Sequence, residues 1–150
     1  QVMRFWSYPA WTQLAQAQAK VDAIATQRRE QDILVWAIAD ADSDLLIGTL
    51  AVFAWNREQG RAEIGYSLHR DWQGRGLASE ALQAVLRVLF NELGLRRVEA
   101  DIDPRNHASC RLVEKLGFQR EGLLRARWQV NEEVCDSLLY GLLRQDFIDP

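Results

Sequence analysis

Three apolar runs in the first half of the chain are separated by short polar turns, a pattern that predicts a meander of antiparallel strands. The turns, Asp40–Asp44 and Asn56–Gly60, are rich in the Asp, Asn and Gly residues that favour chain reversal. The expected strands are Ile33–Ala39, Leu45–Trp55 and Arg61–Leu68.

The other segments carry apolar residues either at helical spacing or in short strand-like runs. Thr12 is the expected N-cap of the first helix, and Gly117 is the expected stop of the last. The apolar face of the first helix consists of Leu14, Ala17, Val21, Ile24 and Ala25. The expected helices are Thr12–Arg29, Leu77–Glu92 and Ala108–Phe118, and the further strands are Arg96–Ile102, Gln119–Leu123 and Ser137–Leu143. This pattern predicts an α+β fold in which helices pack on a mixed sheet.

The composition predicts one globular domain over residues 1–150, because 48% of the residues are hydrophobic and 26% are charged. A net charge of −3 gives no field that favours nucleic acid or an anionic membrane. No apolar run approaches the roughly 20 residues of a membrane span, and no secretory signal pattern is visible. The two cysteines, Cys110 and Cys135, are therefore expected to be free thiols in a cytoplasmic protein. The two histidines are isolated and predict no metal site.

Two glycines and an alanine stand between a predicted strand and a predicted helix, in the run Gln73–Ala78. The first amides of that helix, near Gly76–Ser79, have no partners inside the helix and carry the positive end of its dipole. Small residues there let an anion approach, most naturally a phosphate. The alternative is a tight turn with close helix–sheet packing. The run lacks the P-loop pattern and the full dinucleotide fingerprint.

A second segment, Asp103–Phe118, gives the glycine run a context, because the two together resemble the GNAT superfamily of acetyl-CoA-dependent N-acetyltransferases. The superfamily's pyrophosphate motif, [Q/R]-x-x-G-x-[G/A], is matched by Gln73, Gly76 and Ala78. Its second motif, an asparagine before a short helix that ends in L-G-F, is matched by Asn106 and by the run at Gly117. The resemblance implies a mainly antiparallel mixed sheet with helices on both faces.

Within the superfamily, the runs "AEIGYSL", "DWQGRGLASEAL" and "N-x-x-S" look most like the ribosomal-protein N-terminal acetyltransferases of the Rim type. That likeness implies transfer of an acetyl group to a primary amine, with a protein or peptide N-terminus as one acceptor and amino acids or small amines as others. Family members usually begin with a further strand, so we expect the sheet to lack its usual first strand. Its absence would leave apolar surface uncovered, and we expect a homodimer through Gln1–Trp11 or the strands near Trp128 and Ser137–Leu143. Closure of the monomer's own core by these segments is the alternative.

The resemblance also assigns positions to the cofactor. The pantetheine arm is expected to pair with the free edge of the strand Glu63–Leu68, and the backbone of the glycine run is expected to hold the pyrophosphate. Asn106 is expected to bond the pantetheine arm, and Ser109 to contact the thiolate. Arg75 is either a contributor of positive charge or a solvated surface residue. The implied cofactor residues are Tyr66, Ser67, Leu68, Gln73, Gly74, Arg75, Gly76, Leu77, Ala78, Asn106 and Ser109.

Direct attack by an amine on a thioester needs a proton acceptor for the amine and a proton donor for the leaving thiolate. Many family members place a tyrosine donor seven residues after the motif asparagine, where this chain has Val113. The Rim-type resemblance assigns the contact with the thiolate, and with it the donor role, to Ser109; the alternative is a serine at the helix start that bonds only the backbone. The expected bases are Glu63 and Asp101, with Glu99 on the same strand face as Asp101. Two alternatives to an enzyme stay open here: a non-catalytic acyl-CoA-binding module, and a nucleotide-binding domain that uses the anion site alone.

Overall fold

The computed structural model describes residues 2–6, 9–30 and 33–149, with the backbone alone for residues 25–30. In this part of the chain, six strands form a single sheet in the order β1-β2-β3-β4-β6-β5. All neighbours are antiparallel except β3 and β4, which are parallel. The strands are β1 (Leu34–Ala39), β2 (Leu46–Asn56), β3 (Arg61–Leu68), β4 (Arg97–Ile102), β5 (Gln119–Val130) and β6 (Glu133–Leu143).

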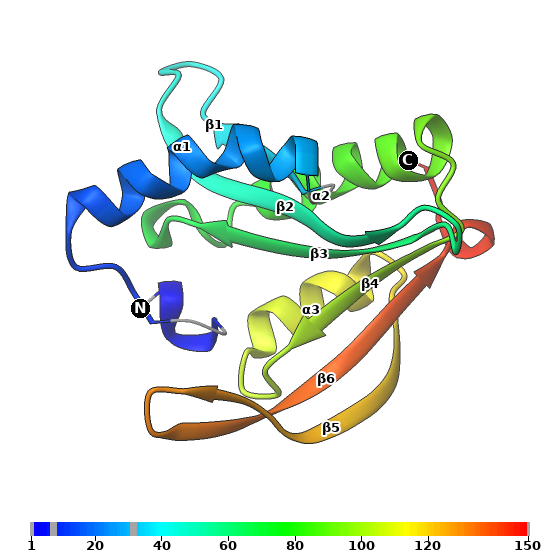
Figure 1. The fold of residues 1–150 in the computed structure, drawn as a ribbon. Helices are drawn as coiled ribbons and strands as arrows, with labels where there is room; N and C mark the ends of the chain where they lie inside the picture. The colour runs from blue at the N-terminus through cyan, green and yellow to red at the C-terminus, as the bar shows by residue number, and fades with distance from the viewer. Residues whose placement is uncertain (1, 7–8, 31–32, 150) are drawn as a thin grey trace.

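Helices lie on both faces of the sheet, which confirms the expected fold class. Figure 1 shows α1 in front of the sheet and α2 and α3 behind it. The main core lies between α2, α3 and the rear face of the sheet, where alternate residues of β3 and β4 are buried. The helices are α1 (Leu14–Glu30), α2 (Leu77–Arg87), α3 (His107–Lys115), the short π-helix η3 (Val88–Glu92) and the 3-10 turns η1 (Val2–Phe5), η2 (Arg70–Trp72) and η4 (Arg144–Asp146).

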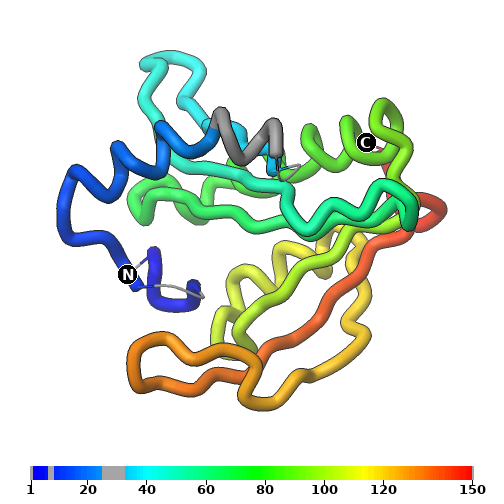
Figure 2. Tube along the Cα trace, viewed as in Figure 1, coloured from blue at the N-terminus to red at the C-terminus, as the bar shows by residue number. Residues whose placement is uncertain are grey.

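The strands β3 and β4 separate soon after they meet. Their parallel pairing covers only Arg61–Glu63 of β3 and Arg97–Glu99 of β4. Beyond these residues the two strands diverge, and the β5–β6 hairpin swings away with β4 (Figure 2). A bulge near this point lies in β2, where the register with β3 shifts after Phe53 and Ala54 has a φ of +49°. The separation leaves one backbone edge of each strand unpaired.

An ion-pair network crosses the closed end of the sheet, where β3 and β4 still pair. Glu99 accepts from Arg61 Nη1 at 3.1 Å and from Arg97 Nε at 2.7 Å. Arg97 in turn donates to both carboxylate oxygens of Glu121 on β5, at 2.8 and 2.5 Å. Gly141 of β6 lies beneath this network, and a Cβ there would stand 2.5 Å from Arg97 Nη1. The network therefore joins three strands, β3, β4 and β5, and commits Glu99 to a structural role.

The first helix differs from the sequence prediction in its cap and in its burial. It begins at Leu14, and the Gln16 side chain, not Thr12, accepts the backbone N–H groups of Thr12 and Gln13, at 2.9 and 3.0 Å. Leu14 is 85% exposed and Val21 is 61% exposed, so the predicted apolar face is not covered there. Helical spacing identifies an apolar stripe, but only a facing element can bury it. The expected homodimer stays a prediction.

The last elements also differ in length from the prediction. The segments expected at Gln119–Leu123 and Ser137–Leu143 are parts of a longer hairpin, because β5 continues to Val130 and β6 starts at Glu133. The helix expected to reach Glu92 changes to a π-helix after Arg87. The expected end of α3 is confirmed, since Gly117 has a φ of +92°. No helix in the described part of the chain is long and apolar enough to cross a membrane.

We expect Gly48→Ala to destabilise the fold, because Gly48 of β2 lies directly against the end of β3. A Cβ at this position would stand 2.4 Å from the Ser67 carbonyl oxygen and 3.2 Å from Leu68 Cα. Backbone atoms cannot swing aside as a side chain can, so the cost should be about 1–3 kcal/mol. At about 2–4 °C per kcal/mol for a chain of this size, the Tm should fall by about 2–12 °C.

The matched control is Gly122→Ala, where an added Cβ would meet no atom within 4 Å. Thermal unfolding followed by circular dichroism should show a Tm for this variant equal to or slightly above that of the parent. Equal melting temperatures for the two alanine variants would contradict the proposed crowding at Gly48.

Candidate active site

Two cavities meet in the gap between β3 and β4. One, the front cavity, opens on the face of the sheet that carries α1, and the other, the loop cleft, runs beside the glycine run; each has a volume of about 520 Å³. The residues that line both are Phe5, Trp6, Tyr66, Asn106 and Ser109. The junction therefore combines η1, the middle of β3 and the start of α3.

The loop cleft has the backbone geometry of an anion site. Gly76 is the N-cap of α2 with a φ of +85°, and it supplies no side chain to the cap. Gly74 has a φ of +76°, and a Cβ at either glycine would meet no atom within 4 Å. The Gln73 side chain donates to the Leu68 carbonyl at 2.9 Å, which ties the loop to the end of β3. The first amides of α2 thus have no side-chain cap and follow two glycines with open space over them, and Glu80 is the acidic residue of that first turn.

The loop cleft brings together every residue assigned to the cofactor by resemblance except Arg75. Arg75 instead places its guanidinium 5.1 Å from the centre of the Trp72 ring. Sequence reasoning missed three cations that line the cleft, Arg70, Arg111 and Lys115. Arg111 and Lys115 are four residues apart on α3 and thus share one helix face, a spacing that could have identified them.

At the junction, capping of α3 leaves the Ser109 hydroxyl available. Asn106 is the N-cap, and its side-chain oxygen accepts the backbone N–H of Ser109 at 3.3 Å. The Tyr66 hydroxyl is buried and makes no hydrogen bond to a described residue. Burial raises the pKa of Tyr66 to about 12, and the nearby Ser109 hydroxyl offsets part of that rise. Val113 is 0% exposed in the core behind the sheet, so it has no part in the site.

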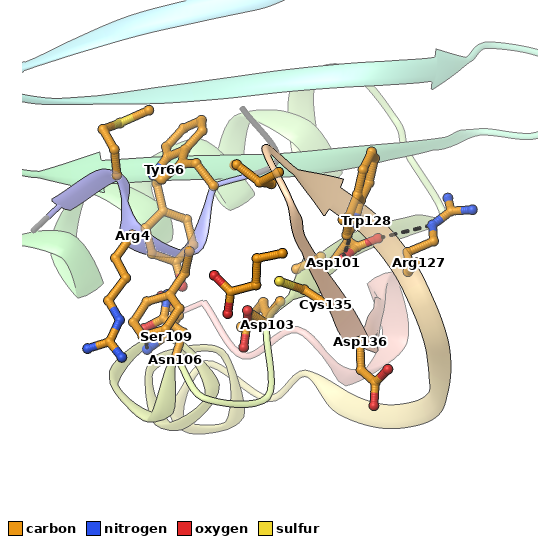
Figure 3. A pocket seen from close by; sticks show the side chains of 18 of the residues that line it. Arg4, Tyr66, Asp101, Asp103, Asn106, Ser109, Arg127, Trp128, Cys135 and Asp136 are labelled. Carbon is orange, nitrogen blue, oxygen red and sulfur yellow. Dashed lines mark hydrogen bonds and ion pairs between the residues drawn. The ribbon is translucent and has the colours of Figure 1, made fainter. Parts of the chain in front are cut away.

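Asp101 of β4 lies in the front cavity with its carboxylate committed to three donors. It accepts from Trp128 Nε1 at 3.1 Å and from the buried Ser137 hydroxyl, and Arg127 Nε lies 3.7 Å from its second oxygen. Burial raises the pKa of Asp101, whereas the Trp128 hydrogen bond and the Arg127 charge lower it. Figure 3 shows Asp101, Arg127 and Trp128 on one side of the cavity, with Tyr66, Asn106 and Ser109 on the other.

Glu63 of β3 differs from Asp101 in having no hydrogen bond or ion pair with any residue that the structure describes. Its pKa is raised to about 7, first by burial and then by the negative charges of Asp101 and Glu99. The positive charges of Arg127 and Arg61 offset part of this rise. Glu63 lines the front cavity, whereas Glu99 does not. A carboxyl group in this state can take up a proton near neutral pH.

The walls of the front cavity come mostly from residues that sequence reasoning missed. They lie on η1 and on the far half of the β5–β6 hairpin, whose length was underestimated. Arg105 joins the loop after β4 to the hairpin by pairing with Asp103 at 2.6 Å and with Glu133 of β6. Within the described residues no group of three His, Cys, Asp or Glu side chains could hold a metal ion. The principal hairpin residues are Arg127, Trp128, Val130, Cys135 and Asp136.

Comparison with known proteins agrees with this arrangement. Residues 1–119 match the family model described as an acetyltransferase (GNAT) domain. The chain is 33% identical over 147 residues to "Uncharacterized N-acetyltransferase p20" of Bacillus licheniformis, covering 98% of this chain and 83% of the relative. Its fold also matches the crystal structure of spermidine N-acetyltransferase from Vibrio cholerae in complex with CoA and spermine, with a TM-score of 0.84 and 20% identity over 97% of this chain and 83% of that one.

The chain also resembles a Rim-type acetyltransferase, but this similarity is weaker than the similarity to the p20 relative. The "[Ribosomal protein uS5]-alanine N-acetyltransferase" of Escherichia coli is 29% identical over 133 residues, which cover 87% of this chain and 68% of that protein. The p20 relative shares more identity over a longer stretch, so assignment to the Rim subgroup is not supported at the level expected. The family assignment is confirmed: the chain belongs to the GNAT family of N-acetyltransferases.

Proposed function

We propose that this N-acetyltransferase moves the acetyl group of acetyl-CoA to a primary amine held in the front cavity, with Glu63 as the general base and Ser109 as the proton donor. The observation that carries the proposal is the meeting of the two cavities at Tyr66, Asn106 and Ser109. The Glu63 carboxyl group lines the front cavity and has no hydrogen bond or ion pair with a described residue. Each cavity provides one substrate with its own binding space, and their junction is where transfer takes place.

The loop cleft fits CoA in shape and in charge. Open space over Gly74 and Gly76 lets the pyrophosphate reach the amides at the start of α2, and Arg111 and Lys115 add positive charge. The unpaired edge of β3 beyond Glu63 can pair with the amide groups of the pantetheine arm. Acetyl-CoA, when bound, supplies the thioester carbonyl that the amine attacks. The orphaned Tyr66 hydroxyl marks the junction where this thioester would find a hydrogen-bond donor.

Of the carboxylates expected as bases, Glu63 fits the role better than Asp101. An amine is mostly protonated at neutral pH, so a nearby group must accept its proton before attack. Glu63 has lone pairs free and a pKa of about 7, close to the working pH of such a base. The Asp101 carboxylate already accepts hydrogen bonds from Trp128 and Ser137 and pairs with Arg127. Its negative charge raises the pKa of Glu63. We therefore assign Asp101 to positioning.

The acceptor that we propose is the N-terminal amine of a peptide or protein. Two observations support it. The β4 backbone at 100–102 lines the front cavity and is not paired with β3, so it offers an edge to an extended peptide. The Escherichia coli relative carries in its name an alanine of a ribosomal protein as its acceptor. Smaller amines would use the cavity but leave this edge unpaired.

The proposal is tested by CoA release from acetyl-CoA with a panel of short peptides, the same peptides blocked at the N-terminus, and small diamines. We expect turnover with free N-termini alone. Glu63→Gln should lower kcat/KM by about 100-fold or more, the usual range for a positioned base. In the parent enzyme kcat/KM should fall as the pH drops below about 7, because protonated Glu63 accepts no further proton.

Glu99→Gln provides the matched control for that pH profile. Because the Glu99 charge raises the pKa of Glu63, its removal should move the acidic limb to lower pH. The amine's own ionisation would not move with this variant. Turnover of the blocked peptides would contradict the proposed acceptor. An acidic limb that stays unchanged in both the Glu63→Gln and the Glu99→Gln variants would contradict the assigned base.

We expect Gly76→Glu to abolish acetyl-CoA binding, because it places a negative side chain where phosphate approaches the amides of α2. The control is Gly94→Glu, since Gly94 also has a positive φ, +68°, and open space around it, yet lines neither cavity. Isothermal titration should show lost binding for the first variant and parental affinity for the second. Equal affinities for the two folded variants would remove the cofactor assignment.

We expect Ser109→Ala to lower kcat by about 100-fold or more while the acetyl-CoA affinity changes only a few-fold. The helix cap uses the backbone N–H of Ser109, so this variant removes the hydroxyl and leaves the cap intact. Ser43→Ala, in the exposed turn between β1 and β2 and outside the lining of both cavities, is the control for turnover and affinity. An unchanged kcat in the Ser109 variant would transfer the donor role to Tyr66.

A further inference from the structure

A wide bulge interrupts β5 beside the front cavity. Three residues of β5, 125–127, stand opposite a single residue of β6, Asp136. The regular pairs on either side are Leu124–Ser137 and Trp128–Cys135. At the centre of the bulge Ala126 has a φ of +52°, a conformation that costs a non-glycine residue free energy. The Ala126 N–H donates to Asp136 Oδ1 at 2.8 Å, which is the contact that holds the bulge.

The bulge brings two adjacent side chains to one carboxylate. In a regular strand Arg127 and Trp128 would point to opposite faces of the sheet. Here Trp128 Nε1 lies 3.1 Å from Asp101 Oδ1 and Arg127 Nε lies 3.7 Å from Asp101 Oδ2 (Figure 3). The Arg127 guanidinium also lies 5.2 Å from the centre of the Trp128 ring. We call this arrangement of Arg127 and Trp128 on Asp101 the Asp101 clamp.

Glu63 is surrounded by charges from three strands. Arg61 lies on its own strand, and Glu99 of β4 stands opposite Glu63 in the strand pairing. Asp101 of β4 and Arg127 of β5, which pair at 3.7 Å, line the front cavity together with Glu63, and their charges act on its pKa in opposite directions. The position of Arg127 is the one that depends on the bulge. Asp136 is exposed, and with described residues its carboxylate makes the bond to Ala126 and no ion pair.

We propose that Asp136 is a positioning residue for acetyl transfer: it holds the β5 bulge, the bulge maintains the Asp101 clamp, and the clamp keeps the Arg127 charge beside Glu63. The step from Glu63 to catalysis rests on the proposed function. The steps from Asp136 to Arg127 and from Arg127 to Glu63 are properties of the folded chain and can be measured without turnover.

The test is a pH titration of the Glu63 side-chain carboxyl by carbon-13 NMR, with the signal assigned by its loss in Glu63→Gln. Asp136→Ala should free Arg127 and raise the pKa of Glu63, on the order of half a pH unit. Asp136→Asn keeps the oxygen that accepts from Ala126 while it removes the same charge, so it should leave the Glu63 titration in place. Loss of the Asp136 charge alone would lower the pKa, the opposite sign.

Two further variants test the route of the effect. Arg127→Gln should raise the pKa of Glu63 as Asp136→Ala does, and the double variant should rise no further than Arg127→Gln alone. Adding Ala126→Gly to the Asp136→Ala variant should return the pKa of Glu63 to its parental value, because glycine takes a positive φ without strain and so keeps the bulge. In kinetics with any amine from the panel, the acidic limb of kcat/KM should move to higher pH in Asp136→Ala and stay in Asp136→Asn.

Any of three results would overturn the proposal. The pKa of Glu63 could stay unchanged in Asp136→Ala, it could shift equally in Asp136→Ala and Asp136→Asn, or the shifts of Asp136→Ala and Arg127→Gln could add in the double variant. Should Asp136→Ala fail to fold by circular dichroism, the Arg127→Gln and Asp136→Asn titrations still decide it. If no amine is acetylated, the proposed function fails while the titration still decides the positioning role. If amines are acetylated and the titration does not move, only the positioning role is lost.

Discussion

The early end of hydrogen bonding between β3 and β4 is the constraint on which the active site depends. Parallel pairing stops at Glu63 and Glu99, and past that point each strand keeps an unpaired edge. Unpaired buried backbone is costly unless a partner satisfies it. The interior of the sheet therefore holds two unpaired strand edges, that of β3 toward the loop cleft and that of β4 toward the front cavity. Neither cavity could reach the other if the two strands stayed paired to their ends.

The same point of separation decides which carboxylate is free to react. On the paired side Glu99 is bound by Arg61 and Arg97, and that network continues to Glu121. On the open side Asp101 is bound by donors from the hairpin. Glu63 stands between these two groups with no partner among the described residues, and burial, together with the negative charges of Asp101 and Glu99, raises its pKa to about 7. The proposed role of Glu63 as the base thus depends on the bonds that its neighbours make.

The backbone of the proposed cofactor half of the site could be predicted from the sequence, because its elements depend on local chemistry. Glycines at 74 and 76 and an N-cap asparagine at 106 act within a few residues of themselves, and the structure gathers them in the loop cleft. The acceptor half could not be predicted in this way. Nothing near Ala126 indicates a positive φ there, because the contact that supports it comes from Asp136, ten residues on across a strand pair. The burial of α1 was predicted wrongly for a related reason. Helical periodicity identifies a row of apolar residues on one face of the helix, but it does not show whether another element covers that face.

This division has a consequence for how the two substrates are recognised. In the proposed function the donor is bound by backbone groups and small residues, and these would tolerate little change because a side chain would occupy the space that phosphate needs. The proposed acceptor site is lined by side chains from η1, from β3 and β4 and from the hairpin, none of which is fixed by a local motif. Exchange of a few of these side chains would alter the front cavity without touching the loop cleft. On the proposed function the fold could therefore keep one acyl donor while its acceptor changes, and the hairpin bulge is the element through which such a change would also reach Glu63.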